Sequence, residues 1–292
     1  MAMRTAHSRF ASCLAVASLG LATALTAGCT TVQAPSAAQA GQAAPTVQSV
    51  SIAMADGTAG ALLFTPAGTG PWPAVLLFGD ASGLRPAFAD IGRELAARGY
   101  VVLVPNEFYR SVALDGSAAT AAPALPASET FQRGQQWRAL ATDDAVMADS
   151  RAYIAWLDSQ ASVDHAARAG AVGYDIGAAH AFLAARALPA RIGVVAAAHP
   201  SAIATTRDNS PHLFVAQSQA AYLVQLAAPD DEREPEDKTD LRNAFSAAGL
   251  DATVSVVPAA HGFAVADQAG YDAAASHAFL EETAGLLDAI LK

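Results

Sequence analysis

Cysteine is almost absent from this sequence, and its absence excludes several kinds of site. Only Cys13 and Cys29 occur among 292 residues. A disulfide framework, or a metal site built on thiolates, needs more cysteines inside the folded part of a chain. We therefore expect neither of them, and we expect no metal and no other cofactor.

Basic residues are also few. Lysine and arginine together number 17 against 27 aspartates and glutamates, which gives a formal net charge of −10. Proteins that bind nucleic acid gather positive charge on one surface to meet the phosphates. The composition therefore indicates no nucleic-acid partner, and we expect a small-molecule substrate or ligand instead.

A long hydrophobic run is missing too. The apolar stretch at residues 10–27 is too short and too rich in alanine to predict a membrane-spanning helix. It follows Arg4 and Arg9 and ends in small residues before Cys29, which is the order of a secretory signal and resembles the lipoprotein cleavage box of bacteria. We predict a signal peptide over residues 1–28 and lipid on Cys29. The lipid would hold the protein on a membrane of a bacterial cell envelope, on the periplasmic or surface side; an uncleaved anchor is the alternative.

Two further segments follow the signal. Residues 29–49 consist almost entirely of small and polar residues with proline, which bury too little surface to fold, so we predict a disordered tether there. Residues 50–292 are predicted to form one domain. The apolar content of 53% supports a sizeable core.

Strands and helices alternate along this domain. Short apolar runs are typical of strands that a parallel sheet buries on both faces, and they alternate with helical stretches that have one apolar face. The pattern predicts an α/β fold with a doubly wound, mostly parallel sheet and helices on both faces, whose active groups lie at the carboxyl ends of the strands. Residues 106–135 have no sustained period and form either a lid or a surface insertion. After an initial hairpin at 50–65, the predicted strands are 74–78, 100–104, 169–174, 192–197, 222–227 and 252–257, and the predicted helices are 86–98, 139–159, 178–188, 236–248 and 271–291.

One stretch organises the domain. Gly173 and Gly177 flank Asp175 at two residues on either side, between an apolar strand and a helix. Small residues at these positions are required by a nucleophile elbow, in which the central residue sits on a strained strand-to-helix turn. A serine or cysteine is expected at the tip, and this chain has an aspartate.

Two other loops supply partners for Asp175. Asp230 and Asp231 follow one later strand, and His261 follows the last one. This is the chain order nucleophile, acid, base of Ser-Asp-His enzymes with an elbow. His199 and His212 are interpreted as structural.

With these loops the chain resembles the dienelactone hydrolase family of α/β-hydrolases from about residue 50 to 291. The matching pieces, in order, are Leu84 through Arg98-Gly99-Tyr100, then 105–110 (Pro-Asn-Glu-Phe-Tyr-Arg), 172–177 (Val-Gly-Tyr-Asp-Ile-Gly), Asp231 before Pro235, and 261–263 (His-Gly-Phe). The resemblance implies the α/β-hydrolase fold and a hydrolase.

The resemblance also implies roles for particular residues. Asp175 stands where the family has its cysteine nucleophile, His261 is the base, and Asp231 is the acid that orients it, with Asp230 as the alternative. The backbone N–H groups of Ile176 and Ala81 would form the oxyanion hole.

Three more residues are implied as substrate-binding. Asp80 stands where the family has an acidic residue that interacts with the nucleophile. Arg110 stands where it has an arginine for a substrate carboxylate, and Tyr109 precedes it. The alternative for Tyr109 and Arg110 is that they only close the turn after a strand.

The aspartate at the elbow limits the chemistry. A carboxylate that attacks an ester would form an anhydride, whereas attack on a saturated carbon that bears a leaving group forms an ordinary ester, which water can hydrolyse. Three hypotheses follow: an exported hydrolase of a small ester, lactone or alkyl-leaving-group substrate, an inactive hydrolase-fold lipoprotein that binds a small ligand, and a structural envelope lipoprotein.

Overall fold

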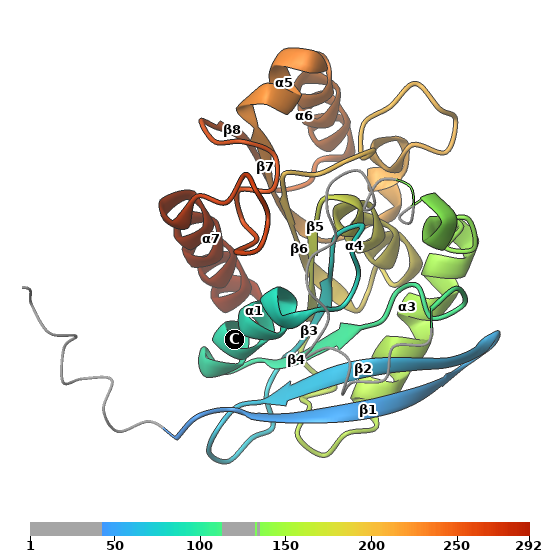
Figure 1. Ribbon diagram of the computed structural model, residues 1–292, viewed down its shortest axis with the longest axis vertical. Coiled ribbons are helices and arrows are strands. Elements are labelled where there is room, and N and C mark those ends of the chain that lie inside the picture. The colour runs from blue at the N-terminus through green and yellow to red at the C-terminus, as the bar shows by residue number, and fades with distance from the viewer. Residues whose placement is uncertain (1–42, 113–131, 133–134) are drawn as a thin grey trace, which may run out of the picture. The chain divides into compact units, whose positions relative to one another are not determined.

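Eight strands form a single sheet in the computed structural model, which describes residues 43–112, 132 and 135–292 (Figure 1). Their order is β1-β2-β4-β3-β5-β6-β7-β8. The bounds are β1 Thr46–Met54, β2 Gly57–Thr65, β3 Ala74–Phe78, β4 Val101–Pro105, β5 Ala169–Tyr174, β6 Ile192–Ala198, β7 Ala221–Ala227 and β8 Ala252–Val257. β1, β2 and β4 pair antiparallel, and all other neighbours pair parallel. The predicted α/β fold is confirmed.

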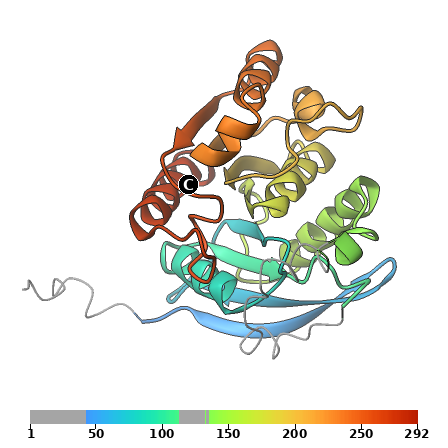
Figure 2. The same cartoon turned by 45° about the horizontal axis from the view of Figure 1, so that its top comes forward.

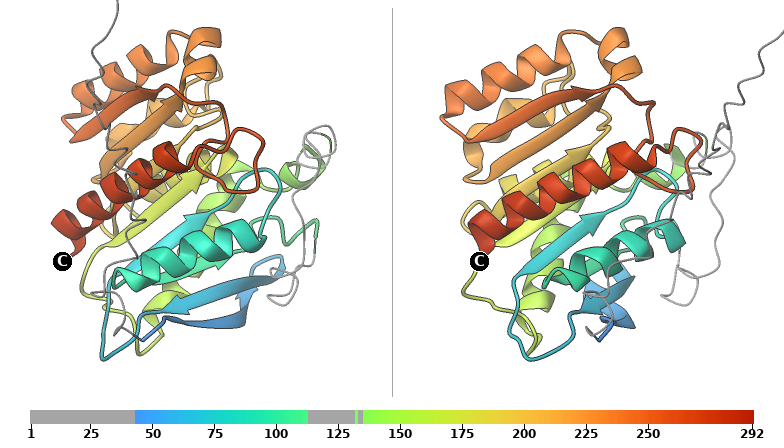
Figure 3. Two further views of the ribbon diagram at one scale, coloured as in Figure 1. Left: turned by 60° about the vertical axis from the view of Figure 1, so that its left-hand side comes forward. Right: turned by 90° about the vertical axis from the view of Figure 1, so that its left-hand side faces the viewer.

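The strands are apolar throughout because helices cover both faces of the sheet. Successive side chains of a strand point to opposite faces. Leu76 and Phe78 of β3 accordingly pack on one side with α3, α4 and α6, while Val75 and Leu77 pack on the other with α1 and α7. Figure 3 shows α1 and α7 lying across one face of the sheet. The helices are α1 Pro86–Ala97, α3 Asp143–Asp158, α4 Ile176–Ala187, α5 Ala228–Arg233, α6 Asp237–Ala248 and α7 Ala273–Leu291.

The helix ends follow local chemistry. The side chain of Thr142 accepts a hydrogen bond from Ala145 N–H at the start of α3, and Asp272 caps α7 in the same way. Gly249 ends α6 in the left-handed conformation, with φ 66°. Within the described ranges, no helix combines the length and the apolar character that crossing a membrane requires.

Four features differ from the prediction. α3 begins at Asp143, four residues after the predicted start at 139, because Thr142 caps it there. β1 begins at Thr46, so the folded region starts before the predicted boundary at residue 50. Pairing with β2 along its whole length holds these extra residues in the sheet. The predicted loops after β6 and β7 contain a short 3₁₀ helix, η3 (Pro211–Gln217), and α5, each with a proline in its first turn.

The two edges of the sheet differ in structure, because one is an antiparallel hairpin and the other is a parallel strand. In Figure 2 the β1–β2 hairpin lies along one edge, and β8 with α5 and α6 lies at the other. The carboxyl ends of β5, β7 and β8, which carry the predicted site residues, belong to the half of the sheet beyond β3. The predicted signal peptide, Cys29 and most of residues 106–135 lie outside the described residues.

Candidate active site

Asp175 occupies a tight turn between β5 and α4. Its φ of 51° and ψ of −116° lie in a region that residues with a side chain rarely adopt. A Cβ on Gly173 would lie 2.1 Å from the carbonyl oxygen of Gly177, and a Cβ on Gly177 would lie 2.0 Å from that of Gly79. The two glycines therefore predict the crowding correctly. The turn packs against Gly79, which directly follows β3.

His261 lies between two carboxylates. Its Nδ1 is 2.6 Å from Oδ2 of Asp230, and its Nε2 is 3.4 Å from Oδ1 of Asp175. The three side chains come from the segments that follow β5, β7 and β8, as the order of the chain predicts. Asp175, His261 and one acid therefore converge.

The carboxylate that contacts His261 is that of Asp230, and the expected contact with Asp231 is corrected. Asp231 forms an ion pair with Lys238 at 2.6 Å and does not contact His261. The reason is the short helix α5, because neighbouring residues on a helix point about 100° apart. Only Asp230 faces the histidine, and Arg233, one turn later, holds it from the other side at 2.5 Å.

Ser201 is a site residue that the sequence did not reveal. Its hydroxyl donates a hydrogen bond to Oδ1 of Asp175, and its backbone N–H donates one to the Asp175 carbonyl at 3.0 Å. Ser201 follows His199-Pro200 in the loop after β6. That loop is held close to the elbow because β6 pairs with β5.

His199 supports the other side of His261. The two rings meet edge to face, with 5.0 Å between their centroids, and neither ring nitrogen of His199 has a hydrogen-bond partner among the described residues. Burial lowers the pKa of His199 to about 3, so this ring is neutral. His212 is hydrogen-bonded to Ser210 at 2.8 Å, away from this group.

The charges of the site depend on the pair formed by Asp175 and His261. Burial alone would lower the pKa of His261, but Asp175 and Asp230 outweigh it and raise the pKa to about 10. Burial alone would raise the pKa of Asp175, but His261 and Ser201 hold it below its usual range. At neutral pH the site therefore contains an imidazolium between two carboxylates.

The loop after β3 carries Ala81 and Asp80. It touches the elbow at Gly79 and Gly177, next to the backbone N–H of Ile176. The expected contact between Asp80 and the nucleophile position is replaced by a different one. Both oxygens of Asp80 accept hydrogen bonds from Arg85, at 2.6 and 2.8 Å.

Arg85 explains why Asp80 turns away. It is 1% exposed and also binds Asp267, in the loop after β8, at 2.7 and 2.8 Å. Gln268 donates a further hydrogen bond to Asp80 at 2.8 Å. Asp80 is thus a structural anion that joins two loops of the site, and its substrate-binding assignment is corrected.

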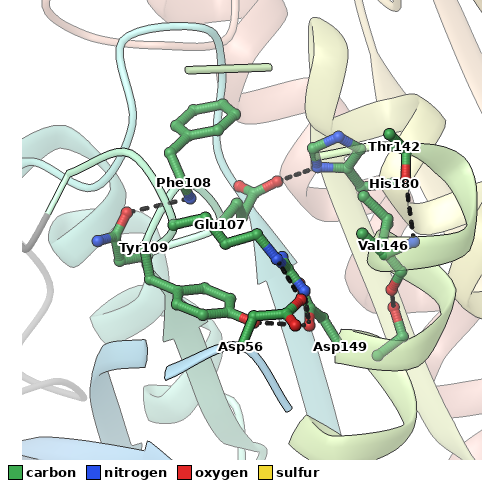
Figure 4. A network of polar contacts seen from close by, with 12 residues as sticks. Asp56, Glu107, Phe108, Tyr109, Thr142, Val146, Asp149 and His180 are labelled. Atoms are coloured by element: carbon green, nitrogen blue, oxygen red, sulfur yellow. Dashed lines mark hydrogen bonds and ion pairs between the residues drawn. The ribbon is translucent and has the colours of Figure 1, made fainter. Parts of the chain in front are cut away.

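Tyr109 and Arg110 also have internal partners. Arg110 binds both oxygens of Asp149 on α3, at 2.6 and 2.9 Å, and Asp56 at 2.8 Å. The hydroxyl of Tyr109 donates to Asp149 at 3.1 Å, as Figure 4 shows. Arg110 is only 10% exposed, and its Nε, Nη1 and Nη2 each already donate to one of these carboxylates, so the guanidinium faces the protein. The structure agrees with the alternative role for these two residues: their side chains fix the turn after β4 to α3 and to the hairpin.

A groove of about 410 Å³ lies beside the elbow. α4 forms one wall with Ile176, Ala179, His180 and Leu183. The rest is mostly polar and comes from the loop after β6 and the segment before α3, including Ala202, Arg207, Asn209, Arg138 and Asp143. No group of three or more His, Cys, Asp or Glu within the described ranges is placed to hold a metal ion.

The sheet, the strained turn and the converging loops place the protein in the class of α/β-hydrolases. The chain belongs to the dienelactone hydrolase family, which it matches over residues 59–291. The family indicates a hydrolase. No curated protein matches the chain.

Solved structures share the fold. A putative dienelactone hydrolase from Klebsiella pneumoniae subsp. pneumoniae is 21% identical with a TM-score of 0.70, covering 84% of this chain and 99% of that one. A dienelactone hydrolase-like promiscuous phosphotriesterase from metagenomic libraries is 19% identical with a TM-score of 0.69, covering 86% and 100%. The dienelactone hydrolase of Anabaena variabilis is 15% identical with a TM-score of 0.62, covering 86% and 100%.

The crowding at the elbow predicts a large effect of one methyl group. Gly177→Ala places a Cβ against the Gly79 carbonyl, so the backbone must shift, and we expect a loss of about 3 kcal/mol in the free energy of unfolding. Gly285→Ala on α7 is the matched control, because nothing lies within 4 Å of its added Cβ. Alanine should stabilise that helix by about 0.5 to 1 kcal/mol. Equal effects in chemical denaturation would contradict the crowding.

The paired carboxylates predict how His261 titrates. Because folding raises its pKa from 6.5 to about 10, its ion pairs stabilise the protein fully below pH 6.5, and this contribution is lost as the pH rises through about 10. NMR titration of the ring should show an imidazolium throughout the neutral range. Asp175→Asn should lower the pKa, since it removes one of the two charges. An ordinary histidine pKa in the wild type would refute the ion pair.

Proposed function

We propose that this protein is an exported hydrolase that acts on a small substrate with a leaving group on a saturated carbon, with Asp175 as nucleophile. The observation that carries the proposal is the position of His261 between Asp175 and Asp230. A histidine that already holds a proton cannot take one from a nucleophile or from water. Ester and lactone hydrolysis by the usual acyl route is therefore disfavoured in the resting site.

The alkyl route suits a carboxylate at the elbow. An oxygen of Asp175 forms a bond to the substrate carbon, and the leaving group departs with the electron pair. If the leaving group is an epoxide oxygen, the proton on Nε2 of His261 is available to it. The product of this step is an ester of Asp175, which carries no charge.

Loss of that charge prepares the second step. With Asp175 esterified, His261 retains only Asp230 as an ionic partner, so its pKa falls. Once its proton has passed to the leaving group or to solvent, the ring can act as a base. Water then gives a proton to His261 and attacks the ester carbonyl. The N–H groups of Ile176 and Ala81 would donate hydrogen bonds to the carbonyl oxygen as it becomes negatively charged. Release of the alcohol restores the carboxylate.

A binding protein is the second candidate. Ser201 and His261 both occupy the same oxygen of Asp175 and lower its pKa, which makes the carboxylate a weaker nucleophile. A chain that kept the groove and lost hydrolysis would also fit this arrangement. The two candidates differ in whether a covalent bond to Asp175 ever forms.

Substitution of Asp175 separates the candidates. In Asp175→Ser or Asp175→Cys the histidine loses one carboxylate, recovers its role as a base and has an acyl nucleophile beside it. Hydrolysis of 4-nitrophenyl acetate should rise about tenfold or more over the wild type. The same variant with His261→Ala is the control and should show no gain.

The wild type should behave in the opposite way. Mass spectrometry should detect an ester on Asp175 after incubation with haloacids or epoxides, and Asp175→Asn should form none, because the amide lacks the attacking charge. If no alkylating substrate leaves an adduct and neither replacement gains esterase activity, the binding function stands in place of the hydrolase.

The proposed address rests on the order of residues before Cys29. Arg4, Arg9, the apolar run and the small residues Ala27-Gly28 predict cleavage before this cysteine and lipid on its thiol. Without residues 1–28 the formal charge becomes −12, because they contain two arginines and no acidic residue. The tether would hold the hydrolase domain clear of the bilayer by roughly 25 Å.

Mass spectrometry of the membrane fraction tests this address. The N-terminal peptide should begin at Cys29 and carry the added mass of acyl chains. Cys29→Ser should abolish the modification and release the protein from membranes. An intact signal, or an unmodified cysteine in the soluble fraction, would refute lipidation.

A further inference from the structure

A second histidine–carboxylate pair lies beside the elbow. Nδ1 of His180, on α4, is hydrogen-bonded to Oε2 of Glu107, the second residue after β4 (Figure 4). The other oxygen of Glu107 accepts the backbone N–H of Gly79 at 2.5 Å. Both side chains are only 5% exposed. The pair is separate from His261 and has no part in the steps proposed above.

Burial determines which hydrogens the pair carries. Desolvation raises the pKa of Glu107, so a pair with a full negative charge is disfavoured. Two arrangements have no net charge: a carboxylate with an imidazolium, and a carboxylic acid whose O–H donates to Nδ1 of a neutral ring. In both of them Nε2 of His180 carries a hydrogen. In either of these arrangements the far edge of the ring is a hydrogen-bond donor.

That edge belongs to the groove. His180 lines the groove together with Ile176, which is four residues earlier and so on the same face of α4. Nδ1 is held by Glu107, so the ring reaches the groove with the edge that bears Nε2. This nitrogen makes no hydrogen bond within the described part of the chain. Nε2 does not belong to the buried polar atoms without a partner, so it is accessible from the groove and can meet a ligand.

We propose that His180 is a ligand-contacting residue whose Nε2–H donates to a carbonyl or carboxylate oxygen of the bound molecule. Asp175 and His180 are five residues apart, a rise of about 7.5 Å along α4, so this oxygen would lie at roughly that distance from the group at Asp175. The inference deepens the proposed function, because it assigns the ligand a second polar group at that separation.

The surroundings favour an oxygen with negative charge. Arg207 contributes a cation to the groove. Asp143 is an acidic lining residue, and Asn209 already donates a hydrogen bond to it at 2.8 Å. A small carboxylate is therefore the appropriate probe.

Glu107 acts as a positioning residue in this arrangement. It fixes the ring of His180 and, through Gly79, the loop that leads to Ala81. The Gly79 carbonyl in turn packs against Gly177 of the elbow. Glu107 would thus hold in place both the ring that contacts the ligand and the loop after β3.

The experiment follows acetate binding to the intact protein by NMR, with nitrogen-15 in histidine and in the backbone. We expect a hydrogen on Nε2 of His180 before acetate is added. Acetate should then shift this resonance in a saturable way, together with the amide of Ile176. Sodium chloride at the same concentrations is the control for ionic strength.

Two substitutions of Glu107 separate a ligand contact from a structural tie. In Glu107→Gln the amide can donate to Nδ1 and still accept from Gly79, so Nε2 keeps its hydrogen and acetate affinity should change about twofold or less. Adding His180→Phe to that variant keeps a ring and removes the donor. The acetate shift of the Ile176 amide should then need about tenfold more acetate. His277→Asn, at an exposed site on α7, should match the wild type.

A ring without a hydrogen on Nε2 overturns the proposal, and so does the absence of any saturable shift at His180. Equal acetate binding with and without the ring nitrogens also overturns it. Acetate binds without turnover, so these outcomes are independent of whether Asp175 forms an adduct. An adduct without a His180 shift removes only this inference, and a His180 shift without an adduct removes only the hydrolase.

Discussion

The contact between Asp175 and His261 is the interaction on which the chemistry of this site depends. A serine or cysteine at the elbow would leave the ring free to take a proton. The carboxylate instead gives the ring a second anionic neighbour beside Asp230, and the pKa of His261 rises to about 10. His261 therefore cannot accept a proton while Asp175 is charged, and can do so only when that charge is removed. Alkylation of Asp175 removes it, whereas binding of an ester does not.

Arginines with carboxylate partners inside the protein hold the segments around this contact. Arg85 connects Asp80, after β3, with Asp267, after β8, and is itself almost inaccessible to solvent. Removal of one partner from such a buried pair leaves a charge without compensation, which is strongly destabilising. Arg110 similarly fixes Asp149 of α3 to the turn after β4. Residues with the charges of a substrate-binding site thus serve to keep its walls in position.

The sheet could be predicted from the sequence because a strand buried on both faces must be apolar, and β3, β4, β5 and β6 are. The elbow could be predicted because only small residues fit where Gly173 and Gly177 approach other backbone atoms. These signals are local. They depend on the residues at the position itself and not on what lies opposite.

The partners of charged residues could not be predicted in this way. Asp230 and Asp231 differ only in their angle around a one-turn helix that the sequence did not indicate. The sequence predicts substrate contacts for Asp80 and Arg110, because it does not show that Arg85 and Asp149 lie opposite them; tertiary packing decides these partners. The sequence could have indicated His180, because it is the one polar residue among the buried residues of α4, which are otherwise apolar or glycine.

Strain at the ends of β5 and β6 argues against a purely structural lipoprotein. Asp175, His199 and Ala202 are the residues other than glycine with positive φ in the described ranges, and all belong to the two loops at the groove. Each such residue costs about 1 to 3 kcal/mol, and the two unpaired ring nitrogens of buried His199 add to that cost. A scaffold without a site would gain stability from glycine at these turns and from an apolar ring in place of His199. The strain is concentrated where a ligand would meet Asp175, which favours a site that still binds or reacts.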